Sequence, residues 1–318
     1  MARKLRIEYP GATYHVLNRG DHREPIFRDD LDRARFLTTL SETCAKTCWE
    51  VHAYCLMGNH FHLVVETPQP NLVAGMKWFL GTYTTRFNRR HKLSGHLFSG
   101  RYKALIVDGS GNGYLRTVCD YVHLNPVRAN LLTEEQSLRE FVWSSYPEYL
   151  KLPARRPAWI RVDRLLGEMR IPKDSTAGRA QFERRMETRR GQESQHDWKD
   201  VRRGWCLGED QFRRELLAQI GCQIGENHFG SERAESAEAK AARIVAEELG
   251  RAGWTEGELG LHPKGDPVKL AVARRLRRET TVTLKWISDR LAMGAWTHLN
   301  RLLYEQRRGG EKQPSCTS

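Results

Sequence analysis

Two histidines separated by one bulky apolar residue are the feature of this 318-residue sequence that most directly indicates chemistry. His60, Phe61 and His62 precede an aliphatic run, as expected of a β-strand. Because side chains along a strand alternate between its faces, the two histidines share one face and Phe61 lies on the other. Two neutral imidazoles held close together suit a divalent metal. A His-x-His pair alone is more often structural, so the metal prediction depends on the rest of the chain.

A second candidate set lies in the segment YLRTVCDYVHLNPVRANL. Tyr121 and Asn125 are four residues apart, so a helix would place them on the same face. A tyrosine near a metal-bound phosphate can be the nucleophile of phosphoryl transfer, and the asparagine amide oxygen can be a third metal ligand. Ordinary roles compete with both. Tyr121 also fits an amphipathic helix core, and Asn125 precedes Pro126, which favours a helix N-cap over a metal ligand.

The elements that must position these residues follow from hydrophobic patterning. The predicted strands are 12–18, 49–57, the segment beginning at 60, and 102–108, with helices from 29 or 30 to about 48 and from 71 to about 90. This order is the ferredoxin-like (split βαβ) pattern, an α+β fold with an antiparallel sheet and helices on one face. The histidine strand would then be central. A helix beginning near Tyr114 would lie across the open face of the sheet.

Composition indicates a polyanionic partner. The net charge is +13, with 19 Lys and Arg against 15 Asp and Glu through residue 150, and 33 against 24 beyond it. A basic surplus of this size is most simply explained by nucleic acid, although a merely soluble basic protein is the alternative. No apolar run reaches the length of a membrane span, and no signal peptide is evident. Seven cysteines without regular spacing indicate a reduced, cytoplasmic protein.

The second half of the chain carries no comparable catalytic set. Residues 151–204 are predicted to be a basic linker with helices, and 205–318 to be a helical C-terminal region. Within it, 268–308 has the spacing of a helix-turn-helix, whose second helix would read the major groove of DNA. A helical bundle with a solvated basic face is the alternative. The predicted DNA contacts at the start of the recognition helix are Trp296, His298, Asn300 and Arg301.

Several motifs in fixed order resemble the single-tyrosine HUH transposases, and the nearest branch is the REP-associated tyrosine transposases. These motifs are MGNHFHLVV, GHLFSGRYKALIVD, and CDYVHLNPVRANL followed by VWSSYPEYL. The resemblance covers about residues 5–150, which predicts a catalytic domain over 1–150. By this resemblance His60 and His62 match the metal ligands, Tyr121 matches the nucleophile, and Asn125 matches the position of the third ligand.

The resemblance also implies an activity and its partners. Such enzymes bind single-stranded or hairpin DNA and cut it with the tyrosine, which leaves a 5′-phosphotyrosine and a free 3′-OH with the help of Mg²⁺ or Mn²⁺. The family includes monomers and dimers, so a homodimer is possible. The basic residues predicted by composition to contact DNA phosphates in this domain are Arg86, Arg89, Arg90, Arg101 and Lys103.

The sequence therefore predicts a metal-dependent single-strand DNA transposase or endonuclease. One rival is a DNA-binding protein that keeps the fold and the helix-turn-helix without activity, and the intact set of two histidines, tyrosine and asparagine argues against it. Another rival is an RNA-binding protein, which the absence of an aromatic stacking pattern disfavours. His123, two residues beyond Tyr121, is expected on a different helix face and in solvent.

Overall fold

The structure, a computed structural model, describes residues 7–193, 198–202, 204–223 and 237–310. The chain divides into two compact units, each with its own hydrophobic core. Unit 1 contains the described residues up to 223 except 45–47, and unit 2 contains the rest. The domain limits predicted near 150 and 204 stay predictions. In the structure the described part of 151–204 lies within unit 1.

Unit 1 is built around a five-stranded sheet in the order β2-β3-β1-β4-β5. The strands are β1 (Ala12–Arg19), β2 (Glu50–Leu56), β3 (His60–Thr67), β4 (Lys103–Val107) and β5 (Cys206–Leu207). The first four pair antiparallel, and β5 is added parallel to β4. The order of β1 to β4 is that of the split βαβ fold, which confirms the predicted α+β class with its mainly antiparallel sheet. The histidine strand β3 is interior, as predicted.

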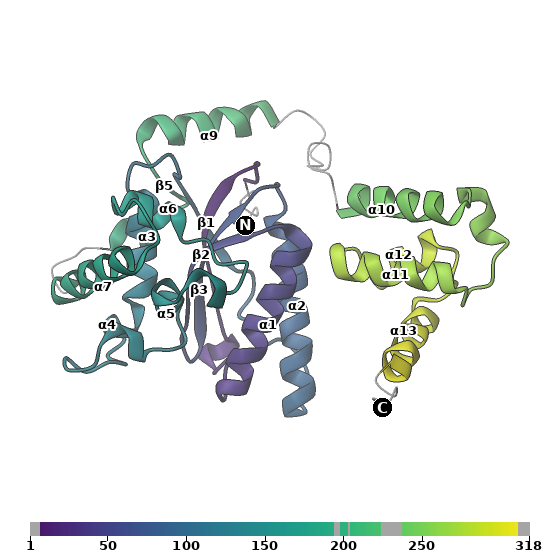
Figure 1. Cartoon of the computed structure of the whole chain (residues 1–318), viewed down its shortest axis with the longest axis horizontal. Coiled ribbons are helices and arrows are strands. Elements are labelled where there is room, and N and C mark those ends of the chain that lie inside the picture. Colours follow the sequence, from purple (N-terminus) through teal and green to yellow (C-terminus); the bar gives the residue numbers. More distant parts are fainter. Residues whose placement is uncertain (1–6, 194–197, 203, 224–236, 311–318) are drawn as a thin grey trace. The chain divides into compact units, whose positions relative to one another are not determined.

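One face of the sheet is covered by α1 (Asp30–Thr47) and α2 (Leu72–His91), as Figure 1 shows. The Phe61 ring centroid lies 5.0 Å from that of Phe36 on α1 and 6.2 Å from that of Phe79 on α2. All three rings are buried. The Phe61 face of β3 is therefore part of the hydrophobic core. His60 and His62, the neighbours of Phe61 in the sequence, must point to the opposite face of the strand.

The opposite face carries α3 (Tyr114–His123), which contacts β2, β3 and β4, and then the short α4 (Asn125–Arg128). Further helices complete unit 1 (Figure 1): α5 (Tyr146–Leu150), α6 (Asp163–Glu168), α7 (Thr176–Gly191), α8 (Lys199–Arg202) and α9 (Asp210–Gln223). Leu165, Phe182 and Met186 belong to the unit 1 core. The segment expected to be a linker thus packs as part of the fold.

The prediction that His123 is solvated is wrong. The side chain is 1 % exposed, and its Nε2 lies 2.8 Å from the hydroxyl of Ser145. The rings of Tyr149 and Phe182 pack edge-on against it from α5 and α7. Burial lowers the pKa of His123 to about 3, so the imidazole is neutral. The prediction failed because α5 and α7, which follow α3 in the sequence, cover the outer side of α3.

Unit 2 is helical, as predicted for the C-terminal part. Its helices are α10 (Ala237–Ala252), α11 (Pro267–Glu279), α12 (Leu284–Arg290) and α13 (Trp296–Gly310). Thr283 caps α12 by accepting a hydrogen bond from the Trp286 amide. The connection from α12 to α13 includes Gly294 at φ +81°. The short α12, the glycine in the connection and α13 follow the order predicted for a helix-turn-helix, and both that motif and its DNA binding stay predictions.

The remaining regular elements are short 3₁₀ turns. They are η1 (Asp21–Arg23), η2 (Leu138–Glu140), η3 (Pro153–Arg155) and η5 (Glu256–Gly260). Among the helices that the structure describes, none combines the length and apolar character required to cross a lipid bilayer.

Candidate active site

His60 and His62 lie on the face of β3 that α3 covers. Their ring centroids are 5.2 Å apart, and His62 stands opposite Leu17 of β1 in the strand register. His62 is 5 % exposed, whereas His60 is half-buried at the end of the strand. The His60 Nδ1 atom lies 2.7 Å from the side-chain oxygen of Asn59. The structure therefore brings the two histidines together as the alternation of the strand predicts.

A third histidine, which sequence analysis missed, completes this face. His15 on β1 places its Nε2 2.9 Å from Nδ1 of His62, and the two rings are stacked. Burial lowers the pKa of His15 to about 3, and burial together with neighbouring His15, His60 and Arg128 holds the pKa of His62 well below its usual value. Both rings are therefore neutral near pH 7, the form in which imidazole binds metals. The only indication of His15 in the sequence was its position within the predicted strand 12–18.

Tyr121 lies on α3 directly above these imidazoles. Its ring centroid is 5.6 Å from that of His62 and 5.7 Å from that of His15. The side chain is 8 % exposed. Two segments more than fifty residues apart in sequence therefore place the candidate nucleophile against the candidate metal ligand.

Asn125 does not act as the N-cap that local sequence rules favoured. It is the first residue of α4, the N-cap position belongs to Leu124, and no side-chain capping hydrogen bond is present there. Asn125 is 7 % exposed, and its amide nitrogen has no hydrogen-bond partner among the described residues. A buried amide without its full set of partners is costly. Its carbonyl oxygen is consistent with a role as a metal ligand, which stays a prediction.

The donors that could hold a metal are few. Within the ranges that the structure describes, no three or more His, Cys, Asp or Glu side chains form a group able to hold a metal ion. The predicted set is different in kind, because it combines the nitrogens of His60 and His62 with the amide oxygen of Asn125. The neutral imidazole of His62 fits such a set, whereas the atom of Asn125 that lacks a partner is its amide nitrogen, which is a hydrogen-bond donor and not a metal ligand. Mixed nitrogen and oxygen donors leave the identity of the metal open.

Two side chains that sequence analysis missed, Arg128 and Trp198, pack against Tyr121, and a third, Glu193, binds both of them. The Arg128 guanidinium lies 4.0 Å from the centroid of the Tyr121 ring, and the Trp198 ring centroid is 5.3 Å away. Glu193 accepts a 2.8 Å hydrogen bond from Trp198 Nε1 and forms an ion pair with Arg128. Arg128 could have been found from its spacing of seven residues after Tyr121, close to two helical turns. Glu193 and Trp198 had no such signal, because they lie in the segment predicted to be a linker.

Two of the predicted DNA contacts are engaged in ion pairs within the protein. Arg86 donates to Glu42 at 2.9 Å. Arg90 donates to Asp29 and to Asp32, the latter at 2.6 Å. The predicted role of Arg86 and Arg90 at DNA phosphates therefore competes with carboxylates that already neutralise them.

The other predicted cations of unit 1 are exposed. Arg89, Arg101 and Lys103 all lie at the surface. Lys103 pairs with Leu17 in the register of β4 with β1, so it shares the sheet face of the histidines. Arg19, which sequence analysis did not select, is also exposed and stands opposite His60. Lys103 and Arg19 are thus the two surface cations that the register places on the face of the candidate site.

The four predicted contacts in unit 2 occupy the first turns of α13. Trp296 is 50 % exposed, Asn300 and Arg301 are exposed, and His298 is half-buried. Leu299 on the same helix is fully buried in the unit 2 core. The helix therefore presents polar and aromatic side chains outward while one side anchors it. Their contact with DNA stays a prediction.

Part of this chain is similar to a known protein family. Residues 8–125 match the sequence model of the family described as IS200-like transposases. The matched stretch includes the histidine pair on β3, Tyr121 and, at its end, Asn125. This match confirms the resemblance to the single-tyrosine HUH transposases that the motifs predicted.

The chain is similar to a REP-associated tyrosine transposase that was solved bound to a REP hairpin, with a TM-score of 0.40 and 14 % sequence identity. The alignment covers 49 % of this chain and 87 % of that one. Among curated proteins, none matches this chain.

Proposed function

We propose that this protein is a metal-dependent transposase that cleaves and rejoins single-stranded DNA, in a hairpin or beside a repeat, through a 5′-phosphotyrosine. The observation that supports it best is the Tyr121 ring lying 5.6 Å from the His62 ring. The family match over residues 8–125 supports the transposase role independently.

The proposed cleavage is a transesterification that needs no external energy source. The Tyr121 oxygen attacks the phosphorus of a DNA phosphodiester, so a tyrosyl O–P bond forms and the P–O3′ bond breaks. The phenol loses its proton, and the departing 3′ oxygen takes one up. A free 3′-OH that attacks the phosphotyrosine reverses these changes and rejoins the strand. A bound Mg²⁺ or Mn²⁺ supplies charge withdrawal from the scissile phosphate.

The residues of the site have three proposed roles: metal ligand, nucleophile, and support for the ligands and the nucleophile. His60 and His62 would hold the metal through ring nitrogens, and Asn125 through its amide oxygen. Because Nδ1 of His62 faces Nε2 of His15 at 2.9 Å, the nitrogen of His62 that would hold a metal is Nε2. The guanidinium of Arg128 lies over the Tyr121 ring, and this cation–π contact holds the ring in place over the imidazoles.

Replacement of the nucleophile tests the proposal. The full-length protein is incubated with end-labelled single-stranded hairpin DNA from the repeats that flank its gene, with Mg²⁺, with Mn²⁺, or with EDTA. A covalent protein–DNA adduct is expected only with metal, and Tyr121→Phe should abolish it because the attacking oxygen is missing. The adduct is measured by denaturing gel electrophoresis, and peptide mapping locates the modified residue.

Tyr114→Phe is the matched control. Tyr114 lies seven residues earlier on the same helix, and its loss should leave the adduct unchanged. An adduct that persists in Tyr121→Phe would show that the nucleophile is another residue. Tight binding without an adduct under every metal condition would instead support the alternative of an inactive DNA-binding protein.

A further inference from the structure

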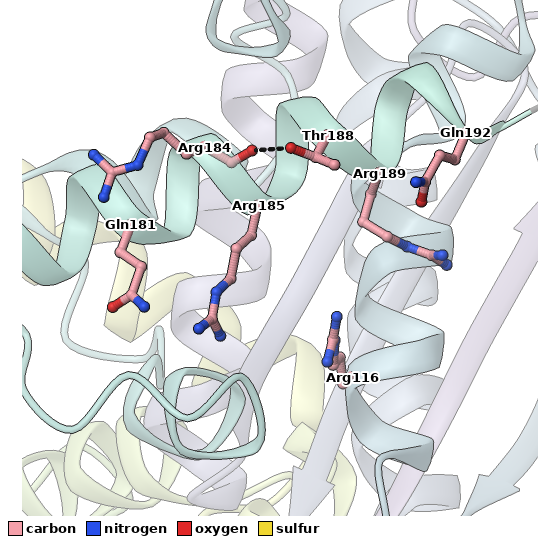
Figure 2. A pocket seen from close by; sticks show the side chains of 7 residues that line it. All are labelled: Arg116, Gln181, Arg184, Arg185, Thr188, Arg189 and Gln192. Atoms are coloured by element: carbon pink, nitrogen blue, oxygen red, sulfur yellow. Dashed lines mark hydrogen bonds between the residues drawn. The ribbon is translucent and has the colours of Figure 1, made fainter.

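A pocket rich in arginine lies between α3 and α7, separate from the imidazole set. It has a volume of about 540 Å³, within the range of small-ligand sites. Its lining residues are Arg116, Gln181, Arg184, Arg185, Thr188, Arg189 and Gln192. Figure 2 shows the side chains of Arg185 and Arg189 extending from α7 on the side of that helix where Arg116 of α3 lies. Five lining residues belong to α7 and recur at helical spacing of three and four, and Gln192 is the C-cap of the same helix, so one side of α7 faces this pocket.

The positive charge of the pocket exceeds its negative charge. Asp120 lies 3.7 Å from Arg116 and 3.5 Å from Arg189, so one carboxylate serves two guanidinium groups. Arg184 and Arg185 have no carboxylate partner among the residues that the structure describes. Glu168 is also near and accepts a 2.8 Å hydrogen bond from the Arg116 amide, but none of the described lining residues is acidic, so the four lining guanidinium groups repel one another unless an anion joins them. The unpaired positive charge therefore indicates an anionic ligand.

The lining chemistry favours a phosphate backbone over a base. The described lining residues include no aromatic side chain, so bases have no surface on which to stack. Guanidinium groups bind phosphate oxygens in bidentate geometry, and amide and hydroxyl groups add donors without reading sequence. Gln181 and Gln192 provide amide groups, whereas the Thr188 hydroxyl donates to the Arg184 carbonyl oxygen at 2.9 Å (Figure 2). A pocket of this kind holds a strand in position rather than selecting its sequence.

The pocket adjoins the candidate nucleophile through a continuous set of contacts. Asp120, which binds two of its arginines, immediately precedes Tyr121 on α3. The Arg189 guanidinium lies 6.0 Å from the ring centroid of Trp198, and the Trp198 ring packs 5.3 Å from Tyr121. A DNA strand that reaches Tyr121 would therefore pass close to these arginines. The lining residues on α7 lie outside the stretch that matches the transposase family, whereas Arg116 on α3 lies within it.

We infer that the α3–α7 pocket binds backbone phosphates of the single-stranded DNA that flanks the bond cut at Tyr121. This inference rests on the proposed function for its substrate class and adds a subsite to it. Arg184 and Arg185 carry the interaction because their charges are not offset within the described protein. Arg116 and Arg189 complete the positive field beside Asp120. The subsite fixes the position of the strand and takes no part in the bond exchange.

Binding as a function of salt tests the subsite. A fluorescein-labelled single-stranded oligonucleotide is titrated with the full-length Tyr121→Phe protein, with and without Arg184→Gln and Arg185→Gln. Each phosphate contact contributes about 0.7 to the slope of log affinity against log salt for single strands. Loss of two contacts should reduce the slope by about 1.4 and weaken binding at low salt about tenfold or more. Arg155→Gln with Arg170→Gln, two exposed arginines of unit 1 outside the pocket, should leave the slope unchanged.

Neutral methylphosphonate linkages then locate the contact. A linkage placed next to the scissile phosphate should weaken binding of the parent protein and have no effect in the Arg184→Gln, Arg185→Gln variant. Equal slopes in the variant and the parent would overturn the inference. The binding measurement does not require cleavage. If Tyr121 forms no adduct, the proposed function is refuted, but the salt slopes still test whether the pocket binds DNA. Circular dichroism confirms that the substitutions preserve the fold.

Discussion

At the scale of single residues, the contact between His15 and His62 determines how the site can bind a metal. A histidine ligand needs one ring nitrogen free for the metal and the other fixed by a partner. His15 supplies that partner at 2.9 Å, and its own burial and lowered pKa keep it an uncharged acceptor. His15 is therefore a positioning residue that acts through His62.

Replacement of His15 should weaken metal binding. His15→Leu removes the acceptor that faces Nδ1 of His62, and the affinity for Mn²⁺ is expected to fall about 10- to 100-fold. His15→Gln retains an acceptor oxygen and should recover most of the loss. Isothermal titration calorimetry with Mn²⁺, without DNA, gives both affinities. Equal affinities for the wild type and His15→Leu, at unchanged melting temperature, would exclude a positioning role.

At the scale of elements, an ion-pair network joins β3 to β2 and α6 away from the histidine pair. Glu66 near the end of β3 contacts His52 of β2 at 3.1 Å and Arg164 of α6 at 2.5 Å. Arg161 approaches the same carboxylate at 3.4 Å. Burial opposes ionisation of Glu66, but hydrogen bonds from His52 and Arg164 outweigh it and lower its pKa to about 2. The network fixes α6 against the sheet.

Acid should release this network in a defined range of pH. The pKa of Glu66 is lower in the folded state than its usual 4.5, so the unfolded state takes up the proton first. The contribution of the carboxylate to stability is therefore complete above about pH 4.5 and declines as the pH falls toward about 2. Glu66→Gln should lower the free energy of unfolding by about 2 kcal/mol at pH 7, and by much less at pH 2 to 3.

Chemical denaturation at several pH values measures this difference. The comparison is between the wild type and Glu66→Gln at each pH, so other acidic groups cancel. Glu24→Gln, at an exposed glutamate of unit 1, is the control and should show a small difference that does not change with pH. A wild-type advantage that stays constant from pH 7 to 2 would contradict the assigned pKa shift.

At the scale of the whole molecule, two units with separate cores divide the candidate roles. Unit 1 contains the imidazoles, Tyr121 and the arginine pocket, whereas unit 2 presents the exposed side chains of α13. The basic surplus beyond residue 150 is not confined to unit 2, because α7 lies in unit 1 and contributes arginines to the pocket. The charge distribution along the sequence therefore does not follow the division into units.

Substitutions on α13 should separate DNA binding from cleavage. Trp296→Ala, Asn300→Ala and Arg301→Ala together remove exposed candidates for base and phosphate contacts, and the affinity for duplex DNA beside the hairpin should fall tenfold or more, since each good contact contributes about 1–3 kcal/mol. The rate of adduct formation at saturating hairpin DNA should not change. Arg274→Ala, at an exposed arginine on α11, is the control. An unchanged duplex affinity would favour the alternative of a solvated helical bundle.

The sequence by itself determined the parts of this protein that depend on short-range order. Alternation along β3 placed His60 and His62 on one face, and the order of strands and helices predicted the split βαβ sheet that the structure contains. The shared helix face proposed for Tyr121 and Asn125 from their spacing stays a prediction, because α3 ends at His123 and Asn125 begins α4. The inferences about β3 and the sheet succeed because strand and helix periodicity are local properties of the backbone.

Only the tertiary structure decided which distant groups complete the site. His15 reaches His62 because β1 pairs with β3, and Trp198 reaches Tyr121 from a segment whose arginine-rich composition predicted a linker. Local rules also favoured a cap at Asn125 and solvent around His123, and the packing of α5 and α7 around α3 produced the opposite result for His123. Burial depends on what the rest of the chain places against a residue, and the periodicity of one element carries no information about that partner.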